Sequence, residues 1–126
     1  MPPVAKKVLI IDDDRTIHLT LRTLFEKNGY QVIAALDAMQ GVMMGRQAKP
    51  DLIVLDIMMP AGGGYYVYEN LQRMSYSFQV PVIVYTAADL NEVSARLGGI
   101  NTIRFIQKGA GMESLLKTAD ELLGGG

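Results

Sequence analysis

The sequence contains no cysteine and no tryptophan, only one histidine, and no apolar run long enough to form a membrane helix. Without cysteine, neither disulfides nor a thiol nucleophile can form. Lys6 and Lys7 precede only a short apolar run, whereas a signal peptide needs a longer one and a small-residue cleavage site. A membrane helix requires about 20 apolar residues. We therefore expect a cytoplasmic protein that does not associate with membranes.

The sequence also lacks an excess of charge of either sign. Its formal net charge is -1 and its pI is about 5.7, which give no broad basic field to attract nucleic acid directly. A length of 126 residues, with 49% hydrophobic and 20% charged residues, is typical of one folded domain. We expect a single domain over residues 1–126 with a core from about 7 to 123, and a glycine tail or the start of a linker at 124–126.

Short apolar runs alternate with helical patterns along the chain. Strands are predicted at about residues 8–11, 31–36, 52–56, 82–86 and 102–107, and helices at about 17–25, 38–48, 67–74, 90–97 and 112–123. A mobile loop is expected at the glycine-rich residues 59–64. Continuously apolar strands suit a parallel sheet that is covered on both faces. Right-handed crossovers then favour a doubly wound, flavodoxin-like α/β fold with five strands in the order 2-1-3-4-5 and five helices.

Four of the predicted strands end at polar residues that could handle a phosphoryl group. The first runs into Asp12 and Asp13, the third into Asp56, the fourth into Thr86 and the fifth into Lys108. The carboxyl ends of parallel strands share one edge, where open α/β sheets bind ligands. Because the predicted order places the first strand beside the third, we expect the three aspartates to be neighbours.

Crowded carboxylates repel one another unless a cation lies between them. Mg²⁺ prefers hard oxygen ligands of this kind, usually one or two carboxylates together with water and phosphate oxygens. We predict that Asp13 and Asp56 bind Mg²⁺, that Asp12 acts through water, and that Met58 supplies its backbone carbonyl. Mn²⁺ is the alternative ion.

With a metal in place, Asp56 is predicted to attack a phosphoryl donor and form an aspartyl phosphate. The Thr86 hydroxyl and the Lys108 ammonium would then contact phosphoryl oxygens. A phosphatase of the haloacid dehalogenase type would also use an aspartate nucleophile. Such enzymes usually carry a second aspartate two residues later, where this chain has Met58.

The ordered set Asp12–Asp13, Asp56, Thr86 and Lys108 resembles that of the CheY-like receiver domains of two-component response regulators, as do Met59–Pro60 and Gly64 after Asp56. The resemblance covers about residues 7–123. It implies a signalling domain that catalyses only its own phosphotransfer and dephosphorylation, with a sensor histidine kinase or histidine phosphotransfer protein as donor. It also implies that Thr86 and Phe105 rearrange together.

The same resemblance implies an output face on the fourth helix, fifth strand and fifth helix, which would bind an unidentified effector or support a phosphorylation-dependent dimer. The chain departs from the family at Gly109, where a proline usually follows the lysine. This departure favours the alternative of a pseudo-receiver, an interaction module that works without phosphorylation. The intact acid pair, Asp56 and Lys108 favour the phosphoacceptor.

Several other residues receive structural interpretations. Met58 and Ala88 stand where polar side chains in some relatives orient water, which predicts slow self-dephosphorylation. Asp14 is expected to cap the first helix, and His18 to be solvated or packed. The eight methionines are expected mainly to fill the core. Tyr65, Tyr66 and Tyr68 are expected to be partly packed in it.

Overall fold

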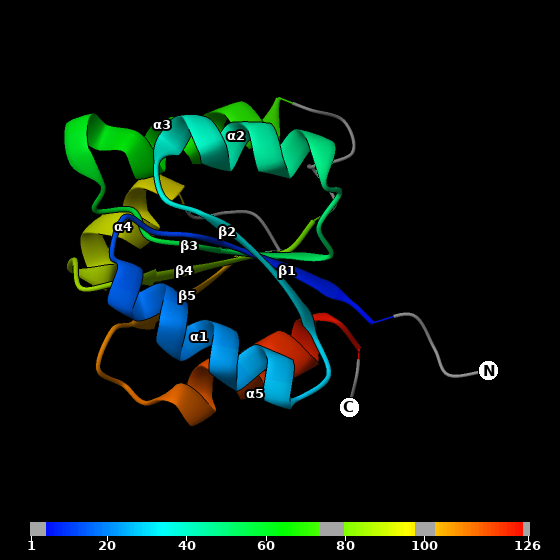
Figure 1. Ribbon diagram of the computed structural model, residues 1–126. Coiled ribbons are helices and arrows are strands. Elements are labelled where there is room, and N and C mark those ends of the chain that lie inside the picture. The colour runs from blue at the N-terminus through cyan, green and yellow to red at the C-terminus, as the bar shows by residue number, and fades with distance from the viewer. Residues whose placement is uncertain (1–4, 74–79, 98–102, 125–126) are drawn as a thin grey trace.

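Five parallel strands form one sheet in the computed structural model, which describes residues 5–73, 80–97 and 103–124 (Figure 1). The strand order is β2-β1-β3-β4-β5, which confirms the predicted order. The strands are β1 (Lys7–Ile11), β2 (Gln31–Ala35), β3 (Leu52–Leu55), β4 (Val82–Thr86) and β5 (Ile103–Gln107). β1 and β3 are direct neighbours in the sheet, with Ile11 in register with Leu55, so the residues that follow these two strands emerge side by side.

Helices cover both faces of this sheet. In Figure 1, α2 and α3 lie above the strands while α1 and α5 lie below them. The helices are α1 (Arg15–Lys27), α2 (Ala38–Gln47), α3 (Gly63–Gln72), α4 (Leu90–Leu97) and α5 (Met112–Leu122). None of the described helices combines the length and the apolar character that a membrane span requires.

The side chains of β1 alternate between two cores although residues 8–11 are all apolar. Leu9 and Ile11 join the core beneath α2 and α3, which also includes buried Val93 of α4. Val8 and Ile10 join the opposite core, with residues of α1 and α5. Burial on both faces explains why the strands read as continuous apolar runs rather than alternating ones.

The prediction of a loop throughout residues 59–64 is wrong. Pro60–Gly62 forms one turn of 3-10 helix, and α3 already begins at Gly63. The cause is a close approach of backbones: a Cβ atom built on Gly64 would lie 2.3 Å from the Cα atom of Ile57. Glycine therefore serves here to seat the start of α3 against the segment that carries Asp56. Met74, Gly98, Gly99 and Thr102, which entered the predicted elements or their ends, lie outside the described residues.

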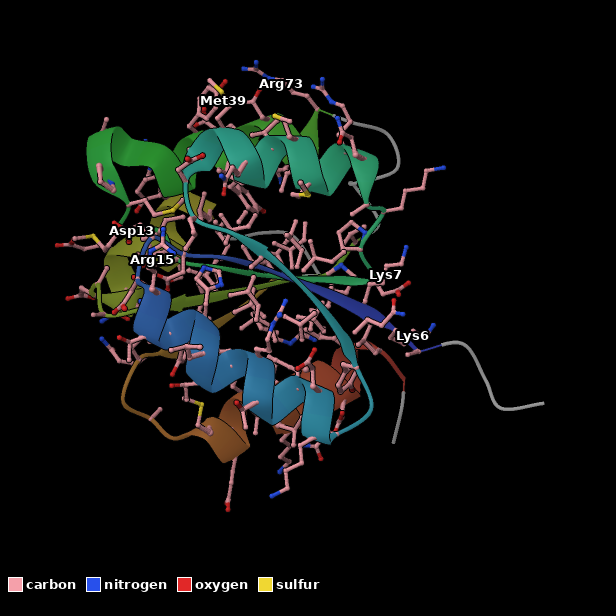
Figure 2. All side chains as sticks on the ribbon, in the orientation of Figure 1. Lys6, Lys7, Asp13, Arg15, Met39 and Arg73 are labelled. Atoms are coloured by element: carbon pink, nitrogen blue, oxygen red, sulfur yellow. The ribbon has the colours of Figure 1, made fainter. Side chains whose placement is uncertain are left out.

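The expectation that methionines mainly fill the core holds for half of those that the structure describes, because Met44 and Met112 pack against the two cores as Met59 does. Met59 is buried, whereas Met39, Met43 and Met58 are exposed, and Met39 projects from α2 at the surface (Figure 2). The tyrosines of α3 divide in the same way, because Tyr68 is buried and Tyr66 is exposed. The period of a helix distributes neighbouring residues over opposite faces, whatever their residue type.

Candidate functional site

The carboxyl end of the sheet gathers the polar residues that the sequence singles out. Asp12 follows β1, Asp56 follows β3, Thr86 ends β4 and Lys108 follows β5. Asp12, Asp56 and Thr86 are 2%, 5% and 0% exposed, so they are polar groups inside the protein. Burial of such groups is unfavourable unless they have hydrogen-bond partners. Figure 2 shows Asp13 beside Arg15, where β1 passes into α1.

Lys108 provides the partner for both buried carboxylates. Its Nζ lies 2.8 Å from Oδ2 of Asp12 and 3.0 Å from Oδ2 of Asp56. One ammonium group therefore connects the ends of three strands. The structure thus brings Asp12, Asp56 and Lys108 together at the carboxyl edge of the sheet, as expected.

Burial and hydrogen bonding have opposite effects on the pKa values of Asp12 and Lys108. Burial raises the pKa of Asp12, with repulsion from Asp56 adding to it, and the hydrogen bonds from Lys108 and the Asp14 amide only partly offset this. For Lys108, burial lowers the pKa, but hydrogen bonds to Asp12 and Asp56 outweigh it and the net shift is upward. The lysine thus remains a cation between two buried carboxyl groups.

Asp12, Asp13 and Asp56 form a group that fits a small divalent cation. One carboxylate oxygen from each lies within 4.8 Å of the others, and Asp13 is exposed to solvent. The donor set consists only of hard oxygens, which Mg²⁺ prefers. Both oxygens of Asp12 already accept hydrogen bonds, Oδ1 from the Asp14 amide at 2.9 Å and Oδ2 from Lys108.

The Asp56 carboxylate is also fixed on both sides. Its Oδ1 accepts a hydrogen bond of 2.9 Å from the backbone amide of Met58, and its Oδ2 accepts from Lys108. The Met58 amide and the Lys108 side chain together orient the carboxylate. The Met58 side chain itself is 64% exposed, so an apolar group borders the site on the solvent side.

Thr86 connects the site to the loop between β4 and α4. Its Oγ1 accepts a hydrogen bond of 3.2 Å from the Ala88 amide, and its carbonyl accepts one of 2.8 Å from the Lys108 amide. Gly109 has φ of 97°, a conformation that glycine adopts readily. No cis peptide bond occurs among the described residues. Lys108 therefore reaches both carboxylates with a glycine, rather than the proline that the resemblance implies, as the next residue.

The role of His18 could not be predicted from its spacing alone. Its Nε2 lies 2.7 Å from the backbone carbonyl oxygen of Asp12, within hydrogen-bond distance, so the side chain of α1 supports the turn that carries the acid pair. The predicted cap is confirmed: the Asp14 carboxylate accepts a hydrogen bond of 2.8 Å from the Thr16 amide. Neither residue is placed as a metal ligand by these contacts.

Replacing Asp12 with asparagine is expected to stabilise the metal-free domain near neutral pH by on the order of 1 kcal/mol. Because its pKa is raised in the folded state, ionisation of Asp12 lowers stability as pH rises above the ordinary value of 3.8. Asparagine removes the charge and keeps one oxygen for Lys108, while the loss of the acceptor for the Asp14 amide limits the gain. Urea unfolding at pH 7 should show the gain, which should shrink toward pH 4.

The matched control for this substitution is Asp37→Asn. Asp37 is exposed and caps α2, and asparagine caps helices as well as aspartate does. The control should leave stability nearly unchanged. A loss of stability in Asp12→Asn at pH 7 would show that attraction to Lys108 outweighs the cost of burial.

Comparison with known proteins gives one consistent result. Residues 8–120 match the family described as response regulator receiver domain. Protein PilH of Pseudomonas aeruginosa is 33% identical over 121 residues, which cover 94% of this chain and 98% of PilH. The alkaline phosphatase synthesis transcriptional regulatory protein PhoP of Bacillus subtilis is 38% identical over 84 residues. That match covers 67% of this chain but only 34% of PhoP.

Solved structures show the same fold. The chemotaxis protein CheY4 of Vibrio cholerae superposes with a TM-score of 0.87 at 24% identity, covering 95% of this chain and all of CheY4. The receiver domain of a signal transduction histidine kinase from Syntrophus aciditrophicus gives a TM-score of 0.83 at 29% identity. That superposition covers 96% of this chain and 92% of the other.

Proposed function

Since the chain belongs to the family of response regulator receiver domains, we propose that Asp56 accepts a phosphoryl group from a histidine kinase or a histidine phosphotransfer protein. The observation that carries the proposal is the bridge from Lys108 to Asp12 and Asp56, at 2.8 and 3.0 Å. An ammonium next to the acceptor oxygen is suited to hold a transferred phosphoryl group.

In the proposed reaction, an Asp56 oxygen forms a bond to phosphorus while the bond from phosphorus to the donor's imidazole nitrogen breaks. The electron pair of that bond stays on the imidazole nitrogen, and the ring takes up a proton so that it leaves as neutral imidazole. The Met58 amide and Lys108 orient the Asp56 carboxylate for this attack. The Lys108 ammonium balances charge on the phosphoryl oxygens, and the Thr86 hydroxyl is available to donate to one of them.

The residues that would hold a metal are Asp13 and Asp56, with Asp12 through water and the backbone carbonyl of Met58. Their spacing and their oxygen-only chemistry support Mg²⁺, with Mn²⁺ as the alternative. When bound, the ion neutralises negative charge between the carboxylates and the incoming phosphoryl group.

The proposed output is a change in an interaction surface rather than turnover of a separate substrate. Thr86 and Phe105 are the proposed switch, and α4, β5 and α5 form the proposed face for an effector or a second copy of the domain. Thr86 and Phe105 lie on neighbouring strands, because Val84 of β4 pairs with Phe105 of β5. This supports a rearrangement that involves both residues. The competing hypothesis is a pseudo-receiver that uses this face without phosphorylation.

Incubation with acetyl phosphate, followed by intact-mass measurement, tests the proposal. We expect a mass increase of one phosphoryl group when Mg²⁺ is present and none when EDTA replaces it. Folded protein that gains no phosphate under either condition would favour the pseudo-receiver. Phosphorylation that is independent of metal would contradict the assigned ligands.

The double substitution Met58→Asn and Ala88→Glu is expected to speed loss of phosphate about tenfold, which corresponds to roughly 1.4 kcal/mol in the barrier. Apolar side chains at both positions cannot orient an attacking water, whereas the new amide and carboxylate can. Decay of the phosphorylated mass after donor removal gives the rate. The exchange of exposed Met43 for asparagine on α2 is the control, and equal decay of both variants would refute the explanation.

A further inference from the structure

Gln107, the last residue of β5, makes contacts that the phosphoryl-transfer proposal does not use. Its side-chain Nε2 donates hydrogen bonds to the carbonyl oxygens of both Ala87 and Ala88, each at 3.1 Å. These residues directly follow Thr86. An exposed side chain at the end of one strand thus holds the loop that leaves the neighbouring strand.

The held loop leads from Thr86 directly into α4. The Ala88 amide donates to the Thr86 hydroxyl oxygen, so the loop carbonyls bound by Gln107 and the Thr86 side chain belong to one hydrogen-bonded unit. The next residue, Asp89, accepts a hydrogen bond of 2.8 Å from the Asn91 amide at the start of α4. Loss of the Gln107 hydrogen bonds would therefore alter the positions of both the Thr86 side chain and the start of α4.

Gln107 is itself held in place from the other side. The Ala110 amide donates to its backbone carbonyl at 3.1 Å, which closes the turn through Gly109, and the Lys108 amide donates to the carbonyl of Thr86. Gln107 is also the register partner of Thr86 across the sheet. The backbone of Gln107 is therefore fixed. Its side-chain amide binds a loop that has no regular secondary structure of its own.

We propose that Gln107 is a positioning residue that holds the β4–α4 loop in the resting arrangement and so opposes the movement of Thr86 toward a phosphoryl group. The inference rests on the proposed function of Asp56 and adds to it a regulator of how readily the switch responds. The amide can donate to the two carbonyls, whereas a carboxylate in the same place can only accept. Gln107→Glu would therefore release the loop with almost no change in shape.

The expected effect follows from population arithmetic. A ligand that binds only the rearranged loop has an apparent affinity proportional to the fraction of molecules already in that arrangement. That fraction is small, so the apparent affinity is low. Loss of hydrogen bonds from an exposed amide should raise that fraction about two- to tenfold. Beryllofluoride with Mg²⁺ serves as the probe, because it imitates an aspartyl phosphate without turnover.

The experiment compares wild type, Gln107→Glu and Gln107→Leu, with Gln31→Leu at the opposite edge of the sheet as the matched control. In wild type without ligand, the Gln107 side-chain NH₂ signals should exchange slowly with water. Both Gln107 variants should bind beryllofluoride about two- to tenfold more tightly. Their free-state amide shifts at Thr86 and Ala88 should move part of the way toward those of the bound wild type.

Unchanged or weaker affinity, with unchanged free-state shifts at Thr86 and Ala88, would overturn the positioning role. So would rapid exchange of the Gln107 NH₂ protons in the free wild type. Failure of the proposed function looks different, because wild type itself would then show no metal-dependent binding while the Gln107 signals still report on the loop contacts. The leucine variant separates loss of the donor from any effect of the new charge in Gln107→Glu.

Discussion

Replacing Asp56 with asparagine is expected to abolish phosphate acceptance while leaving the fold intact. An amide oxygen is a poor nucleophile, and the substitution also removes a proposed metal ligand. The geometry should survive, because the amide oxygen can still accept from either the Met58 amide or Lys108. Intact mass after incubation with acetyl phosphate and Mg²⁺ should show the phosphate adduct in wild type and none in the variant.

The control for this experiment is Asp14→Asn, which removes a nearby carboxylate from outside the proposed metal group. Asp14 caps α1 through the Thr16 amide, and asparagine serves equally well at that position. Asp14→Asn should take up phosphate as wild type does. Phosphate on Asp56→Asn at the wild-type level would place the acceptor elsewhere and contradict the account.

Substituting alanine for Gly64 is expected to destabilise the domain by about 3 kcal/mol or more. The added Cβ would lie 2.3 Å from the Ile57 Cα and 2.6 Å from the Asp56 carbonyl oxygen. These are backbone atoms, which cannot move aside as a flexible side chain can. Thermal or urea unfolding of Gly64→Ala against wild type measures the loss.

The neighbouring substitution Gly63→Ala provides a matched control on the same turn. Its Cβ would lie 3.2 Å from the Ala38 Cβ and 3.4 Å from the Met59 Cβ, which are side-chain atoms. Gly63 has helical backbone angles, and alanine is favoured over glycine in helices by about 1 kcal/mol. Its net effect should be small. Equal destabilisation by both substitutions would refute the argument from the backbone contact.

Much of the fold could be predicted because apolar periodicity and strand position depend on local sequence. The fourth helix was predicted at residues 90–97 and lies at Leu90–Leu97, and the strand order follows from parallel strands with right-handed crossovers. The proximity of Asp12 and Asp56 followed from that order, which places β1 beside β3, whereas the reach of the Lys108 side chain from β5 past β4 did not. The strand order brings together residues that are far apart in sequence. That order could be predicted from the pattern of strands.

The details that could not be predicted depend on contacts between segments. The 3-10 turn at Pro60–Gly62 and the early start of α3 depend on how closely Gly64 approaches Ile57, which no local pattern encodes. The contact of His18 with the Asp12 carbonyl joins a helix to the turn before it. Gln107 gave no sequence signal, because its two hydrogen bonds depend on the path of the β4–α4 loop.

Titration of the wild-type domain with beryllofluoride and Mg²⁺, followed by backbone NMR, tests the central claim most directly. The account predicts metal-dependent shifts at Asp56 and its neighbours that extend to Thr86 on β4 and to Phe105 on β5. Shifts that stay at Asp13 and Asp56, or a folded protein with no shift at all, would contradict a phosphorylation switch and leave a constitutive interaction module.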